Sequence, residues 1–308
     1  MASTQQMEMK CEPRAQLEWG FGGRRRLRDG ALLIALFLGG IGAGQFVVST
    51  WLFDYPLSAA IGLLFVGAGK SAAHLIYLGR PVRFYRLFLK PRTSWISRGL
   101  IAMIVLLIFG AGYLGPQYGF DWLPWSTEDN LGKIIWLVAL AAAFVVMAYD
   151  GFVLASCRSI PSWHTMLLPV MFFAYSIAGG LAMTALTYLC DSGAKIDLDA
   201  LMFLDLMLLG AMLSLVVFYI TNLAGSDVTA RESLRMLLMS RTAVFFIGLA
   251  IIVGLLMPLV LGIVHIVELQ GSIALTLLAV TAMLELAGDI SMRHSILKAG
   301  LHMPVYWT

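Results

Sequence analysis

Charged residues are scarce in this chain: Asp, Glu, Lys and Arg make up 13% of its 308 residues, while 60% are hydrophobic. A soluble domain carries about 25% charged residues. The hydrophobic residues also fall in many separate runs rather than pooling in one core. Only helices and closed barrels pair every backbone group inside lipid, and runs of about 20 apolar residues indicate helices. The sequence therefore predicts an all-α, polytopic membrane protein.

The chain is also poor in the residues that hold metals. Its three cysteines, Cys11, Cys157 and Cys190, are far apart and form no C-x-x-C pair, so we expect no iron–sulfur cluster or zinc site here. A bis-histidine haem needs two histidines at matched depth on different helices. His74 is the only histidine well inside an apolar run, so we expect neither haem nor another metal site.

Soluble segments are short as well. About 30 mostly polar residues precede the first apolar run, with no small-residue cleavage pattern, so we interpret them as a retained segment rather than a signal peptide. No internal repeat, linker or low-complexity segment is evident. We expect an N-terminal cytoplasmic segment (1–30), a transmembrane domain (31–292) and a cytoplasmic tail (293–308). Any soluble catalytic machinery must then come from other proteins.

Eight apolar runs are long enough to span a bilayer. They are Ala31–Phe53, Ser58–Leu78, Ser97–Leu114, Leu131–Leu154, Met166–Leu189, Ala200–Leu223, Ala243–His265 and Ser272–Ser291.

Basic residues are distributed very unevenly around these spans. Eighteen Lys and Arg lie on the side that holds both termini, and only Lys133 and Lys195 lie on the other side. Cytoplasmic connections carry the excess of Lys and Arg. We therefore predict a multi-pass protein of the inner (cytoplasmic) membrane with both termini in the cytoplasm.

The connection from Tyr77 to Gly99, YLGRPVRFYRLFLKPRTSWISRG, holds six cations and no acidic residue. Positive-inside bias alone is one explanation. Six cations exceed what topology requires, however, so a docking surface for an acidic partner is the other explanation.

Ionisable residues inside a membrane are costly and are functional candidates by default. They are Lys70, Asp150, Asp205, Glu285 and Asp289.

Lys70, His74 and Tyr77 share one face of the second span, because they are spaced at i, i+4 and i+7. Asp150 and Tyr149 lie at similar depth on the fourth span. The eighth span carries Glu285, Asp289 and Arg293 in one row, and the first carries Gln45 near mid-membrane. We expect these four helices to form one pocket in the cytoplasmic half.

A quinone suits such a pocket. Its apolar tail enters from lipid, its carbonyls need hydrogen-bond donors, and its reduction consumes two protons. A Lys or His donor stabilises the charge that develops on a reduced carbonyl, and a carboxylate or imidazole relays the proton. His74, Asp150 and Glu285 are the relay candidates.

Each of these residues also has a structural explanation. Lys70 can serve only to pair with Asp150 or Glu285, and His74 can be a core residue. Glu285, Asp289 and Arg293 can form a structural ion-pair row, and Asp205 can be structural.

Three motifs resemble those of a known family. The Tyr77–Gly99 stretch resembles the "HLG-x-P-x-R … SSWLSRE" signature of the dimethyl sulfoxide reductase membrane anchor, in the wider polysulfide reductase (NrfD-like) family. VLASCRSIPSWHT (Val153–Thr165) resembles its "YASLR-x-I-P-x-WH-x-P", and GDISMRHSILKAGLHMP (Gly288–Pro304) resembles its "LRY-x-x-LRAG". With eight spans, the resemblance covers essentially the whole chain.

The resemblance implies a membrane anchor for a molybdopterin catalytic subunit and a four-cluster ferredoxin-like iron–sulfur subunit. Such anchors exchange electrons between quinone, either ubiquinone or menaquinone, and the nearest cluster, usually with no cofactor of their own. Besides membrane lipid we expect these partners, and no nucleic acid. The family's loop histidine falls on Tyr77, its glycine on Gly79, its arginine on Arg83 and its acidic residue on Gly99. The quinone-pocket candidates are Gln45, Lys70, His74, Tyr77, Gly79, Arg80, Arg83 and Asp150.

Orientation refines this expectation. In the dimethyl sulfoxide and polysulfide reductases the signature loop and the catalytic subunits lie outside, whereas eighteen cations place the loop inside here. That is similar to the cytoplasm-facing sulfite:quinone oxidoreductases, which pass electrons from sulfite to quinone. The alternatives are an anchor of a sulfoxide- or polysulfide-type reductase that uses quinol, a secondary transporter or ion relay built on Lys70, Asp150 and Glu285, and a passive anchor.

Overall fold

The computed structural model describes residues 23–78, 91–191, 196–268 and 272–303. Within these ranges, eight helices are long and apolar enough to cross a membrane, judged by length and composition. This confirms the all-α class and the eight predicted spans. Which end of the bundle faces the cytoplasm stays a prediction.

The helices begin and end within a few residues of the predicted limits, with two exceptions: α1 begins eight residues before Ala31, and α10 ends beyond Ser291. α1 covers Gly23–Trp51, α2 Pro56–Leu64, α3 Ser71–Leu78, α4 Trp95–Leu114, α5 Asn130–Ala155, α6 Leu167–Cys190, α7 Leu198–Gly225, α8 Val228–Met239, α9 Met257–Glu268 and α10 Ser272–Lys298. α10 runs seven residues beyond the predicted end, because Arg293 is buried inside the bundle with its charge paired.

Two of the spans contain a π-helical segment. Phe65–Lys70 (η3) joins α2 to α3, and Val244–Leu256 (η6) precedes α9. π-helical turns place the hydrogen bond one residue further along the chain and are frequent at functional sites. No feature of the sequence patterns predicted them.

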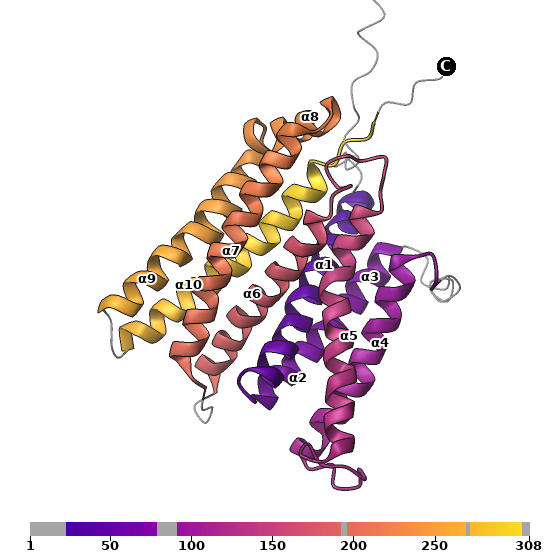
Figure 1. The fold of residues 1–308 in the computed structure, drawn as a ribbon, viewed down its shortest axis with the longest axis vertical. Coiled ribbons are helices and arrows are strands. Elements are labelled where there is room, and N and C mark those ends of the chain that lie inside the picture. Colours follow the sequence, from indigo (N-terminus) through magenta and orange to yellow (C-terminus); the bar gives the residue numbers. More distant parts are fainter. Residues whose placement is uncertain (1–22, 79–90, 192–195, 269–271, 304–308) are drawn as a thin grey trace, which may run out of the picture.

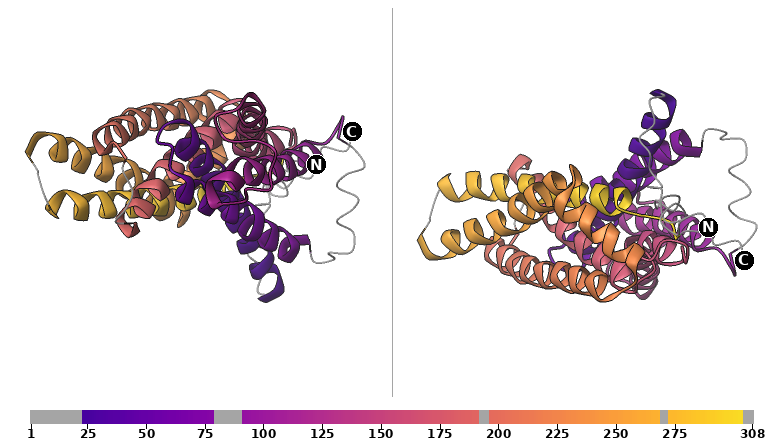
Figure 2. Two further views of the ribbon diagram at one scale, coloured as in Figure 1. Left: turned by 90° about the horizontal axis from the view of Figure 1, so that it is seen from below. Right: turned by 90° about the horizontal axis from the view of Figure 1, so that it is seen from above.

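α1 and α6 run through the middle of the bundle, as Figure 1 shows. α1 packs against α2, η3, α3, α5, α6 and α10. One hydrophobic core joins α1, α2, α4 and α5, and another joins α6, α7, α8, η6 and α10. Figure 2 shows the second group extending away from the first, so the bundle is wider than it is deep.

The start of α1 and the end of α10 lie at the same end of the bundle, together with α8 and the ends of α3 and α5 (Figure 1). The α1–α2 and α4–α5 turns lie at the opposite end. This arrangement agrees with an even number of crossings.

α8 is an amphipathic helix that the sequence analysis missed. Asp227 caps it by accepting a hydrogen bond from the backbone N–H of Ala230 at 2.8 Å. Its buried residues, among them Ser233 and Leu237, face the bundle, while Arg235 stays exposed beside Glu232. At 12 residues it is too short to span a bilayer.

Glycines bring α1 and α6 into backbone contact. A Cβ at Gly44 would overlap the carbonyl group of Ser176, and a Cβ at Gly180 would overlap the backbone of Gly44. Small residues permit this approach in membranes, where van der Waals packing holds helices together. The central helix pair therefore depends on these two positions.

We expect Gly44→Ala to destabilise the folded chain by about 1–3 kcal/mol or more, because the added methyl group must push two backbones apart. Denaturant unfolding in detergent micelles measures this. Gly210→Ala on α7 is the matched control, because a Cβ there meets nothing within 4 Å. Equal stability of the two variants would contradict the close packing of α1 against α6.

Candidate functional site

A buried ion pair joins the second and fourth spans. Lys70, the last residue of η3, places its Nζ 2.9 Å from Oδ2 of Asp150 on α5. The side chains are 1% and 3% exposed. Lys70 Nζ also lies 4.6 Å from the ring centroid of Tyr149, a cation–π contact. Lys70, Asp150 and Tyr149 therefore lie together, as either a pocket or a purely structural pair requires, and their roles stay predictions.

The first span makes room for the lysine. A Cβ at Gly39 of α1 would lie on the aliphatic part of the Lys70 side chain, 2.8 Å from its Cε. Any larger residue there would displace Lys70. The packing of α1 therefore directs the ammonium group toward Asp150.

His74 follows Lys70 by one helical turn on α3, and its Nδ1 lies 3.3 Å from the backbone oxygen of Lys70. With Nδ1 donating to that oxygen, Nε2 is the acceptor of the neutral ring. His74 is partly exposed, and it lines a cavity together with Lys70 and Tyr149.

This cavity, which we call the lysine pocket, has a volume of about 450 Å³. Its lining residues are Lys70, Ser71, His74, Leu75, Ile96, Leu100, Met103, Ile104, Leu107 and Tyr149. Small-molecule sites measure roughly 300–1,000 Å³ and are mostly apolar with a few polar groups. Exposed Leu75 and Ile96 lie at its rim, so an apolar chain can enter between α3 and α4.

Gly99 on α4 explains how Tyr149 reaches this pocket. A Cβ at Gly99 would overlap the Tyr149 ring. Tyr149 thus occupies the space that a side chain at Gly99 would fill, at the position where the family's signature has an acidic residue. Tyr149 is therefore the residue with a polar group whose ring lies beside position 99 in this protein.

Gln45 does not join the lysine pocket. Its Nε2 donates to Ser58 Oγ at 3.0 Å and to Thr187 Oγ1 at 3.2 Å, which joins α1, α2 and α6. Ser49 donates to the same Ser58 at 2.7 Å. This separate polar cluster satisfies the amide nitrogen of Gln45, whereas its buried Oε1 has no hydrogen-bond partner in the described structure.

The eighth span is also separate from the lysine pocket. Arg293 Nε lies 2.7 Å from Asp289 Oδ1, and its guanidinium stands 4.8 Å from the Phe172 ring centroid. Glu285, 6% exposed, lies instead beside the carboxyl group of Asp205 on α7. Within the described residues, the four helices therefore do not form one pocket, and the ion pair at the lysine pocket comes from the second and fourth spans.

Both buried cations pack against α1. A Cβ at Gly39 would meet Lys70, and a Cβ at the next residue, Gly40, would lie 2.8 Å from Arg293 Nη2 and 2.6 Å from Ser176 Oγ. Two buried cations thus lie against neighbouring positions of one helix, about 100° apart around its axis. Like charges repel strongly at low dielectric, so each needs its own carboxylate.

Several candidates remain predictions in their proposed roles. Gly79, Arg80 and Arg83 lie outside the described residues. Tyr77 is partly buried on α3 and does not line the lysine pocket. Among the described residues, no three His, Cys, Asp or Glu side chains are grouped to hold a metal ion. The apolar wall from α4, including Leu100 and Met103, was missed because its residues look like any other membrane helix.

We expect Lys70→Met and Asp150→Leu to destabilise the protein by about 3–5 kcal/mol each, since either leaves a buried charge unpaired. The double variant K70M/D150L should be much less destabilised than the sum of the two. Denaturant unfolding of the four proteins in micelles measures the coupling. Additive effects would show that the two side chains do not pair.

Comparison with known proteins tests the family resemblance that the sequence motifs indicated. The family model "Polysulphide reductase, NrfD" matches residues 29–305. The sequence is 26% identical over 297 residues to a polysulfide reductase chain of Wolinella succinogenes, covering 87% of this protein and 92% of that one. It is also 26% identical over 137 residues to a sulfite dehydrogenase subunit of Allochromatium vinosum, covering 42% of each. The resemblance that the motifs indicated is confirmed, and this chain belongs to the NrfD, polysulphide reductase family.

Proposed function

We propose that this protein is the quinone-reactive membrane subunit of a molybdopterin and iron–sulfur oxidoreductase, and that the lysine pocket is its quinone site. The observation that carries this proposal is the pairing of an apolar cavity of about 450 Å³ with Lys70, His74 and Tyr149 on its wall. An apolar tail fits between α3 and α4, and the polar groups suit a carbonyl ring.

Each polar group has a distinct task. Lys70 donates a hydrogen bond from Nζ to one carbonyl oxygen, and its charge favours electron density on that oxygen. Asp150 keeps the lysine charged and aimed, because the two groups lie 2.9 Å apart in a buried setting. The bound quinone supplies two-electron redox chemistry, taking two electrons and two protons when it becomes quinol.

Protons need a route to and from the pocket. His74 is partly exposed, and its Nε2 is free of the bond that Nδ1 makes to Lys70. We assign to this nitrogen the transfer of a proton between the α3–α4 end of the bundle and the pocket. Asp150 is the second relay candidate through Lys70. Glu285 does not line this pocket and lies beside Asp205, so we assign it no direct part here.

Electrons come from, or go to, partner proteins. We propose that the basic connection after α3 docks an acidic four-cluster iron–sulfur subunit, which in turn carries the molybdopterin subunit, all on the cytoplasmic side. The charge bias of eighteen cations supports this side. The partial match to a sulfite dehydrogenase subunit favours sulfite as electron donor, whereas the longer match is to a polysulfide reductase chain.

We expect His74→Leu, and the double variant K70M/D150L that leaves no buried charge unpaired, to lower quinone-coupled turnover of the assembled complex by about 10²-fold, the usual contribution of a positioned proton donor or relay. Turnover with an artificial acceptor that bypasses the membrane should be unchanged. Arg235→Gln on the exposed face of α8 is the control. Unchanged quinone turnover with an intact complex would favour a passive anchor. Uptake of a polar solute by a chain that is stable without the partner subunits would favour a transporter.

The orientation gives a separate prediction. A reporter that is active only in the cytoplasm, fused after Thr308, should be active, and a periplasm-dependent reporter should be silent. The physical reason is the excess of Lys and Arg on the side of the termini. The same two reporters inserted in the α4–α5 loop should give the reverse pattern. An external C-terminus would place the partner subunits outside and remove the argument for sulfite.

A further inference from the structure

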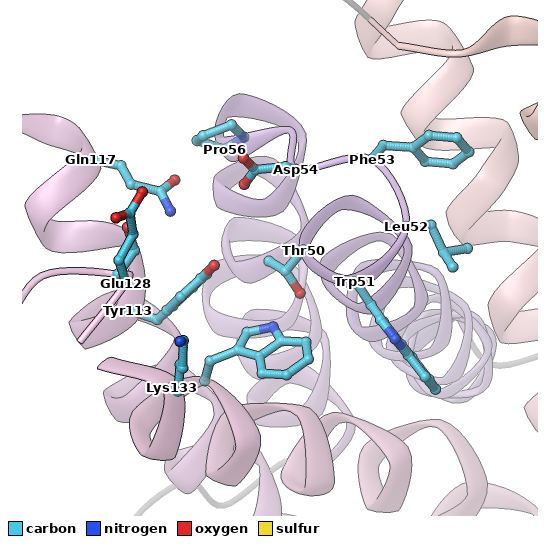
Figure 3. Close-up of a pocket in the computed structure, with 12 residues that line it drawn as sticks. Thr50, Trp51, Leu52, Phe53, Asp54, Pro56, Tyr113, Gln117, Glu128 and Lys133 are labelled. Atoms are coloured by element: carbon cyan, nitrogen blue, oxygen red, sulfur yellow. The ribbon is translucent and has the colours of Figure 1, made fainter. Parts of the chain in front are cut away.

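A second, larger cavity lies at the opposite end of the bundle from the lysine pocket. It measures about 930 Å³ and is formed by the α1–α2 turn, the end of α4 with the turn after it, the α4–α5 loop and the start of α5. Its lining residues are Thr50, Trp51, Leu52, Phe53, Asp54, Pro56, Tyr113, Gln117, Thr127, Glu128, Lys133 and Trp136 (Figure 3). None of these residues has a role in the proposed quinone chemistry.

The charges around this cavity are mixed. Asp54 and Glu128 come from two different connections, and Lys133 comes from the first turns of α5. Figure 3 shows all three around one opening, with Gln117 and Tyr113 between them. None of the three forms a salt bridge with another residue in the described part of the protein. Two carboxylates and one ammonium suit a ligand with a cationic and an anionic group.

The walls that carry these charges are held in place. Asp54 has a left-handed backbone with φ of 44°, a conformation that costs free energy in most residues but that Asp and Asn tolerate. Asp129 accepts a hydrogen bond from the backbone N–H of Ser126 at 3.0 Å, which lowers the pKa of Asp129 and closes the turn that carries Glu128. Trp125 Nε1 donates to the backbone oxygen of Gly112 at 3.0 Å and ties this loop to α4.

The cavity also lies at the depth of a membrane–water interface. It sits where four spans end or begin: Trp51, Pro56, Tyr118 and Asn130 are the span limits around it. Aromatic residues such as Trp51 and Tyr113 are typical of that level. Trp51 is 55% exposed and Leu52 is 47% exposed, so the cavity continues onto the lipid-facing surface. A ligand here is both charged and apolar.

We propose that this cavity is a binding site for the headgroup of an aminophospholipid. The primary ammonium group lies between Asp54 and Glu128, and the phosphate lies beside Lys133. The acyl chains run along Trp51 and Leu52 toward the bilayer. A purely anionic headgroup would bring a further negative charge to two carboxylates, and a choline headgroup has no N–H to donate to them.

Thermal unfolding of the full-length protein in detergent micelles tests this site. Added phosphatidylethanolamine should raise the midpoint temperature in a saturable way, and phosphatidylglycerol and phosphatidylcholine should raise it much less. The double variant D54N/E128Q should lose at least about half of the shift, because Asn keeps the left-handed backbone of residue 54 while the charge is removed. D121N, on an exposed acid of the same loop outside the cavity, should keep the whole shift.

Soluble glycerophosphoethanolamine distinguishes a lipid from a free zwitterion. Stabilisation by the lipid alone supports the lipid site, since the acyl chains then contribute. Stabilisation by the soluble headgroup at similar concentration would overturn it in favour of a small-molecule site. An equal response to all three lipids, or an unchanged response of D54N/E128Q, would also overturn it. Quinone turnover plays no part in these readouts.

Discussion

Two buried cations packed against one glycine pair are the constraint on which the rest of this bundle depends. Lys70 and Arg293 both lie deep between helices, where an unpaired charge costs several kcal/mol. Each has one carboxylate partner, and Gly39 and Gly40 of α1 leave space for one cation each. Two ion pairs therefore pack against neighbouring positions of α1, which constrains how α5 and α10 are placed around it.

The two ion pairs differ in their surroundings. The half with α2, α3, α4 and α5 holds a cavity of about 450 Å³ next to its ion pair. In the other half, the Asp289–Arg293 pair is enclosed between α10, α6 and α1, and Phe172 covers the guanidinium. One pair is therefore next to a space that a ligand can enter, whereas the other is packed. The proposed quinone site is for this reason assigned to the first half.

Much of this organisation follows from the sequence, and the reasons are physical. Eight runs of apolar residues predict eight spans, because lipid excludes unpaired backbone groups. The proximity of Lys70 to Asp150 follows from depth, because both lie near the same ends of their spans and an isolated charge there is too costly. Depth does not give the angle around the bundle axis, however. For that reason we expected Gln45 and Glu285 in the same pocket, whereas Gln45 donates a hydrogen bond to Ser58 and Glu285 lies beside Asp205. α8 was missed because its mixed composition resembles a solvated connection.

The π-helical segment before α3 sets the angular phase of that pocket. An α-helix turns by about 100° per residue, and the π-helical turns at Phe65–Lys70 accommodate an additional residue within the same rise. The preceding α2 and the following α3 are therefore out of step with one continuous α-helix. Losing a single residue from this segment would rotate α3 relative to α2 by about one residue's turn, so either Lys70 would leave Asp150 or α2 would lose its contact with α1. Relatives that differ in length at this point would present a different face of the second span to the pocket, with no change in the residues themselves.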